Sequence, residues 1–154
     1  MINLSSRITN LLEFEAAYMQ DWLSSFSDSP TGKARRAWLG TTGEYMIIER
    51  LPLPDGFAPD EIDAMVLLDN FPAVAPIGLY VLNNGNERLV SQLRNRMNAY
   101  RNTAFHGAPS IPGYTWLCYV YQDNKWHYNA AAPNKGDCIR KFIASFFAVL
   151  EGKS

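Results

Sequence analysis

The sequence predicts an α+β fold in which one long helix precedes an antiparallel sheet. Three observations support this fold class. Apolar residues recur at helical spacing through Ser5–Ser25, four short apolar runs follow with links of turn length, and a second helical pattern covers residues 137–150. Because strands joined by short turns favour an antiparallel meander, the sequence indicates one α+β domain spanning residues 1–154.

Composition limits the compartment and the classes of partner. The chain has 154 residues, of which 47% are hydrophobic, and this is enough for one core without disulfides. A net charge of −1 gives no electrostatic support for binding nucleic acid or an anionic membrane. Two cysteines make no disulfide framework, and neither a signal peptide nor a membrane-spanning stretch is expected. The sequence therefore indicates a cytoplasmic protein of a reducing compartment.

The first helix is predicted over Ser5–Ser25, with Ser5 or Ser6 as its cap. Its apolar stripe is expected to face the sheet and to leave Glu13, Gln20 and Asp21 outward. The stripe consists of Ile8, Leu11, Leu12, Ala16, Met19, Trp22, Leu23 and Phe26.

Four strands are predicted to follow the first helix. They cover residues 37–41, 45–50, 63–68 and 78–82, and the first two form a hairpin around Thr42-Gly43.

The second half of the chain is predicted to hold two further helices. Asn86 is a suitable cap for a helix over residues 87–100, and Asp137 for a last helix over 137–150. Residues 103–113 are expected to form a loop. Four arginines lie off the apolar face of the first of these helices, where they form either a solvated surface or a site for an acidic partner. They are Arg88, Arg94, Arg96 and Arg101.

The stretch Gly113–Trp126 carries the strongest indication of chemistry. Thr115–Tyr121 is almost continuously apolar and aromatic, which predicts a buried extended segment, and Asp123-Asn124 then provides a polar turn. A cysteine near the end of a rigid apolar segment is held in place and partly open to solvent, as a nucleophilic thiol requires. Cys118 is therefore a candidate nucleophile, although free cysteines are more often buried and inert.

The remaining cysteine and the two histidines leave alternatives open. Cys138 follows a predicted helix cap, where the positive end of the helix dipole stabilises a thiolate. His106 and His127 are candidates for orienting a carbonyl group or assisting proton transfer, but a loop histidine is often only solvated. The two cysteines and two histidines could bind zinc, but they lack a closely spaced pair such as C-x-x-C.

Taken together, these motifs resemble the ubiquitin-conjugating enzyme (UBC) fold, and its bacterial members in particular. Phe71-Pro72-x-x-x-Pro76 resembles the Tyr-Pro-x-x-Pro-Pro segment after the third strand of that family. Leu117-Cys118, with Trp126 eight residues after the cysteine, resembles the catalytic segment. Leu51-Pro-Leu-Pro-Asp-Gly-Phe57 resembles the Leu-Pro-x-Gly turn of bacterial members. The order of the elements is also similar, apart from the inserted helix around 87–100.

The resemblance implies a function. Cys118 would carry a ubiquitin-like protein as a thioester, received from a ubiquitin-activating-like enzyme and passed to an amine of a target protein. The resemblance implies no cofactor or metal for this transfer, and it implies a setting in bacterial antiphage defence. His106, twelve residues before Cys118, stands where the family has His-Pro-Asn, but His106-Gly107-Ala108 lacks the asparagine. Asn124 or His127 would then have to stabilise the oxyanion.

Two other functions are compatible with the same residues. A non-catalytic UBC-fold adaptor would bind a ubiquitin-like protein while Cys118 only packs. A zinc-stapled interaction module would use the cysteines and histidines as ligands.

Overall fold

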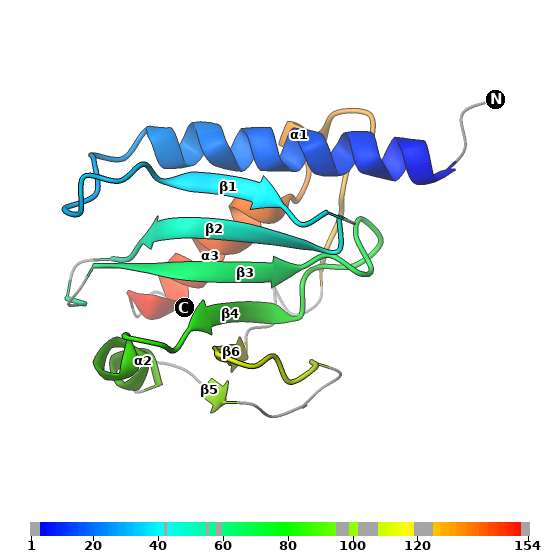
Figure 1. Ribbon diagram of the computed structural model, residues 1–154. Helices are drawn as coiled ribbons and strands as arrows, with labels where there is room; N and C mark the ends of the chain where they lie inside the picture. Colours follow the sequence, from blue (N-terminus) through cyan, green and yellow to red (C-terminus); the bar gives the residue numbers. More distant parts are fainter. Residues whose placement is uncertain are drawn as a thin grey trace.

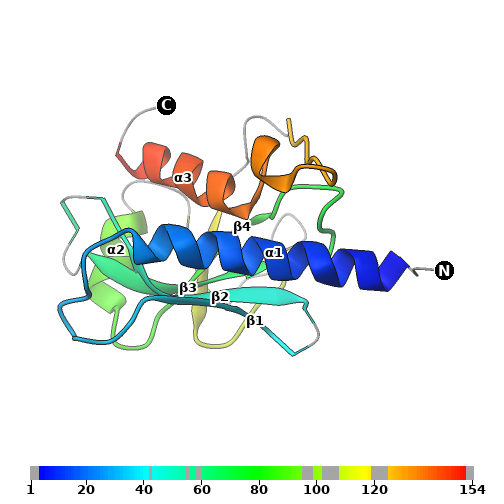
Figure 2. The ribbon, with the colours of Figure 1, turned by 90° about the horizontal axis from the view of Figure 1, so that it is seen from above.

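The chain forms an antiparallel sheet with a long helix along one edge and a second helix across one face (Figures 1 and 2). The computed structural model describes residues 4–41, 43–54, 56–57, 60–94, 99–101, 108–118 and 125–151. The elements are, in order, α1 (Leu4–Ser24), β1 (Arg36–Leu39), β2 (Tyr45–Pro52), β3 (Glu61–Leu67), β4 (Gly78–Leu82), α2 (Glu87–Arg94), β5 (Ala99–Arg101), β6 (Tyr114–Cys118), the 3-10 turn η2 (Pro133–Lys135) and α3 (Ile139–Leu150).

The first four strands form the predicted meander. The sheet order is β1-β2-β3-β4-β6-β5, and each neighbouring pair is antiparallel. The hairpin between β1 and β2 and the start of β4 at Gly78 agree with the sequence analysis. The prediction of only four strands is wrong, because β6 pairs with β4 and β5 pairs with β6. The apolar segment before Cys118 is therefore part of the sheet itself.

The helix predicted over residues 87–100 is shorter in the structure. It ends at Arg94, and Ala99–Arg101 forms β5 against residues 115–117 of β6. The apolar periodicity predicted a helix for residues 99 and 100. Their backbone N–H and C=O groups instead form hydrogen bonds with the edge of the sheet.

The core lies between the sheet and the helices. On β2 and β3, alternate residues such as Met46, Ile48 and Val66 are buried, because successive side chains of a strand point to opposite faces. Phe142, Ile143 and Phe146 of α3 pack in the same cluster, as predicted for the last helix. From α1 the buried apolar residues are Leu12, Met19 and Leu23, which lie on one stripe of the helix.

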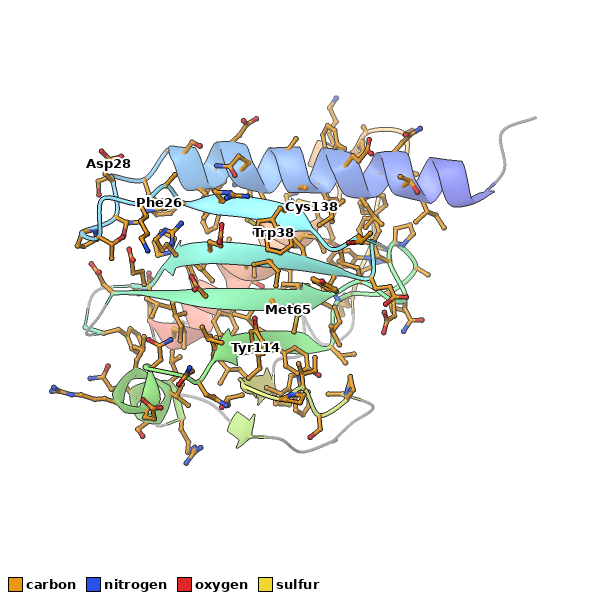
Figure 3. All side chains as sticks on the ribbon, viewed as in Figure 1. Phe26, Asp28, Trp38, Met65, Tyr114 and Cys138 are labelled. Carbon is orange, nitrogen blue, oxygen red and sulfur yellow. The ribbon has the colours of Figure 1, made fainter. Side chains whose placement is uncertain are left out.

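Among the described residues, no helix packs on the opposite face of the sheet, which has its own apolar cluster. A row of paired residues crosses the sheet on this face, and Figure 3 shows its members Trp38 and Met65, with Tyr114 nearby. The row consists of Trp38, Ile47, Met65, Tyr80 and Trp116. The segment from Ala108 to Tyr114 packs against part of this row, and the thiol of Cys118 belongs to the same cluster.

The first helix also covers the β1 edge, and here one prediction is wrong. Gln20 was expected to point outward, but its side-chain oxygen accepts the Ala37 N–H at 2.9 Å. Its amide nitrogen donates to the Arg35 carbonyl at 3.0 Å. The side chain thus replaces a neighbouring strand at that edge, whereas Glu13 and Asp21 are exposed as predicted.

Among the residues that the structure describes, no helix combines the length and the apolar composition that crossing a bilayer requires.

Candidate functional site

Cys118 is the last residue of β6 and is half-buried. It shares the helix-free face with Tyr114 and Trp116, while Thr115 and Leu117 point into the buried side of the strand. This alternation follows from the two-residue repeat of a strand. The sequence therefore fixes the backbone of Cys118 in the sheet and leaves its side chain partly open to solvent.

A glycine lies directly opposite the cysteine. Gly78 of β4 pairs with Cys118 and has a φ of +139°, which side chains rarely allow. A Cβ at Gly78 would lie 2.4 Å from Nε1 of Trp116, so the indole occupies the space that a side chain would need. The indole N–H donates to the Ile77 carbonyl at 3.1 Å. On its β4 side, the thiol thus has no cross-strand side chain beside it.

The environment of Cys118 favours the neutral thiol. Burial raises its pKa above the usual value. A nucleophilic role would require the thiolate, which these surroundings disfavour.

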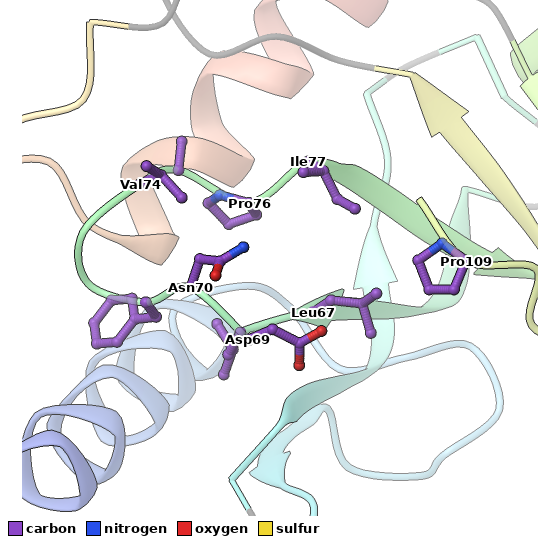
Figure 4. A pocket seen from close by; sticks show the side chains of 10 residues that line it. Leu67, Asp69, Asn70, Val74, Pro76, Ile77 and Pro109 are labelled. Carbon is purple, nitrogen blue, oxygen red and sulfur yellow. The ribbon is translucent and has the colours of Figure 1, made fainter. Parts of the chain in front are cut away.

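A hollow of about 250 Å³ lies beside this end of the sheet (Figure 4). Its wall comes from the loop between β3 and β4 and from Pro109, with Asp69 and Asn70 as its polar side chains. Ile77 lines the hollow and also belongs to the apolar cluster that contains Cys118. Ile77 is therefore the residue that links the hollow to the cluster of Cys118, whereas Cys118 itself does not line the hollow.

Trp126 fixes the loop between β3 and β4 from the other side. Its indole N–H donates to the Pro72 carbonyl at 2.9 Å. The ring of Tyr128 meets that of Phe71 edge-on, with centroids 4.9 Å apart. These two contacts hold residues 126–128 against the loop that contains Pro72 and Pro76.

His127 is exposed, and its backbone is fixed by Asp137. The His127 N–H donates to the Asp137 carboxylate at 2.7 Å, and its carbonyl accepts the Asp137 N–H at 2.9 Å. Trp126 and Tyr128 pack against the core on the helix side, whereas Cys118 lies on the other face. Within the described part of the chain, the structure gives no hydrogen bond between His127 and Cys118. His106 and Asn124 lie outside the described residues.

Cys138 occupies a different environment. It is the N-cap residue of α3, so the prediction that Asp137 caps this helix is wrong. The Asp137 carboxylate is oriented toward His127 instead. Cys138 is 0% exposed, and burial raises its pKa despite a hydrogen bond with the Lys141 backbone. Of the two thiols, only that of Cys118 is open to solvent.

Sequence reasoning missed Glu15, which is 1% exposed. Its Oε1 accepts the Ile139 N–H at 2.8 Å, so a side chain of α1 caps the start of α3. Burial raises its pKa from 4.5 to about 7. The available signal was a carboxylate located between Leu12 and Met19, within the apolar stripe.

The described residues contain no group of three or more histidine, cysteine, aspartate or glutamate side chains that could hold a metal ion. No protein-family model, curated protein or solved structure matches this chain.

Proposed function

We propose that this chain is a UBC-like conjugating enzyme that carries a ubiquitin-like protein on Cys118. One observation carries the proposal. Two of the motifs behind the sequence resemblance lie side by side in the structure. The Trp126 indole N–H donates to the Pro72 carbonyl, and Gly78, two residues after Pro76, pairs with Cys118 on the neighbouring strand. Residues 54 positions apart are joined directly by the Trp126 bond. The chain around the two prolines therefore lies beside both Cys118 and Trp126, and this arrangement supports the resemblance.

The proposed chemistry is thiol exchange followed by aminolysis. The Cys118 thiolate attacks the thioester on a ubiquitin-activating-like enzyme, so that a new S–C bond forms and the thiol of that enzyme leaves. An amine of a target protein then attacks, an amide forms and the Cys118 thiol is released. Both steps pass through an oxyanion, which requires a fixed hydrogen-bond donor. Asn124, His127 and His106 are the proposed polar groups.

The partners follow from this chemistry. They are a ubiquitin-like protein, its activating enzyme and a target with a free amine, and we place them in the bacterial cytoplasm as part of antiphage defence. Genes for the first two proteins next to the gene for this chain would support this setting.

The decisive experiment is a loading assay. The chain is mixed with an activating enzyme, a ubiquitin-like protein and ATP, and the adduct is resolved with and without a thiol reductant. We expect an adduct that the reductant removes, because a thioester exchanges with free thiols. Cys118→Ser should give a reductant-resistant ester or no adduct, and Cys138→Ser is the matched control that should load normally. Loss of loading in the Cys138 variant alone would refute the assignment of Cys118.

A non-catalytic adaptor is the second candidate, and the raised pKa of Cys118 favours it. An adaptor would bind the ubiquitin-like protein without forming an adduct, and Cys118→Ser would bind equally well. Calorimetry with the isolated ubiquitin-like protein separates the two functions.

A further inference from the structure

Glu15 joins two helices that are far apart in the sequence. It lies on the buried face of α1, and its carboxylate accepts the first N–H of α3 across 124 residues of chain. No side chain of α3 itself caps that helix. The Glu15 carboxylate is therefore the side chain of α1 that caps the start of α3.

The second oxygen of the Glu15 carboxylate accepts no hydrogen bond from the described residues. Glu15 Oε2 and the Tyr128 hydroxyl are both buried and have no hydrogen-bond partner among the described residues. Burial raises the pKa of Tyr128 and of Cys138, and the charge of the nearby Glu15 raises both further. Figure 3 shows Cys138 close to α1.

The cations near this junction offset the charge of Glu15 only weakly. Arg140 and Lys141 lie in the first turn of α3, and both lower the pKa of Cys138. The Arg140 guanidinium lies 4.7 Å from the centre of the Tyr18 ring rather than on the carboxylate. An ionised Glu15 is thus a buried anion held by one backbone N–H and the end of a helix dipole, which is an unfavourable state.

We propose that Glu15 is a pH-dependent latch, which holds α1 over the start of α3 when protonated and exposes the Cys138 thiol when ionised. This inference goes beyond the proposed function and does not depend on it. Because the carboxyl titrates at about 7, the latch would respond to changes near neutral pH.

The test measures alkylation of Cys138 by a small maleimide in a Cys118→Ser background, where Cys138 is the remaining thiol of the chain. The rate is compared with that of the same protein carrying Glu15→Gln, which keeps an acceptor for the Ile139 N–H but cannot ionise. Because both proteins share the same thiol, the ratio of their rates removes the pH dependence of thiolate formation. Glu13→Gln, at an exposed position on the same helix, is the matched control.

We expect the ratio of the parent rate to the Glu15→Gln rate to rise roughly tenfold between pH 6 and pH 8. The Glu13→Gln protein should behave like the parent. Hydrogen exchange of the Ile139 amide gives a second measurement if Glu15→Gln alters folding, and its protection should fall over the same pH range in the parent. A constant rate ratio, or constant protection of that amide, would overturn the proposal.

Discussion

At the scale of single residues, Glu15 controls the pH dependence of folding stability. Its pKa is raised by burial from 4.5 to about 7, so the folded state holds a proton that the unfolded state has already lost. Stability is therefore highest below about pH 4.5, falls as the pH rises through about 7 and reaches its lower level above that pH. The shift corresponds to a contribution of about 3 kcal/mol.

Denaturant titrations over this pH range test the assignment. Glu15→Gln should remove the decrease in unfolding free energy between about pH 4.5 and pH 7, since the amide does not titrate. Glu13→Gln, which removes an exposed carboxylate from the same helix, should leave the decrease intact. An equal slope in the Glu15→Gln protein would show that another group is responsible.

At the scale of elements, Gln20 closes the β1 edge of the sheet. Its side chain makes one hydrogen bond to the Ala37 N–H and another to the Arg35 carbonyl. Gln20→Ala should lower the unfolding free energy by about 1–2 kcal/mol, because both bonds are lost while the backbone groups stay half-buried. Asp21→Ala, at the adjacent exposed position, should change stability by less than about 0.5 kcal/mol. Equal effects of the two substitutions in chemical denaturation would contradict the edge-capping role.

The helices and strands differ in how well they could be predicted from the sequence. The periodicity of α1 and the turn residues around Gly43 placed the helix and the first hairpin, because both signals are local. The pairing of residues 115–117 with both β4 and β5 depends on contacts far along the chain, and no local pattern contains it. Glu15 was missed for the same reason, because its partner Ile139 is 124 residues away. At the site, the position of Cys118 at the end of an extended segment was predicted, but its glycine neighbour was not.

At the scale of the whole molecule, the two faces of the sheet carry different groups of residues. The helix face holds the core, the Glu15 junction and the bonds of Trp126 and Asp137 that fix the segment after the cysteine. The opposite face presents the half-buried Cys118 within its own apolar cluster. The exposed face of α1, with Glu13 and Asp21, remains free of contacts with the core.

We propose that the activating enzyme docks on this exposed face, as the resemblance to conjugating enzymes implies. Reversing both charges, Glu13→Lys with Asp21→Lys, should slow loading of Cys118 about tenfold at low ionic strength, because complementary charges accelerate association. The melting temperature should hardly change, since both side chains are exposed. Asp60→Lys with Glu87→Lys reverses the same number of exposed charges elsewhere and is the matched control. The difference between the two variants should shrink as salt screens it. If loading is equally fast in both variants at low salt, the activating enzyme does not dock through this face of α1.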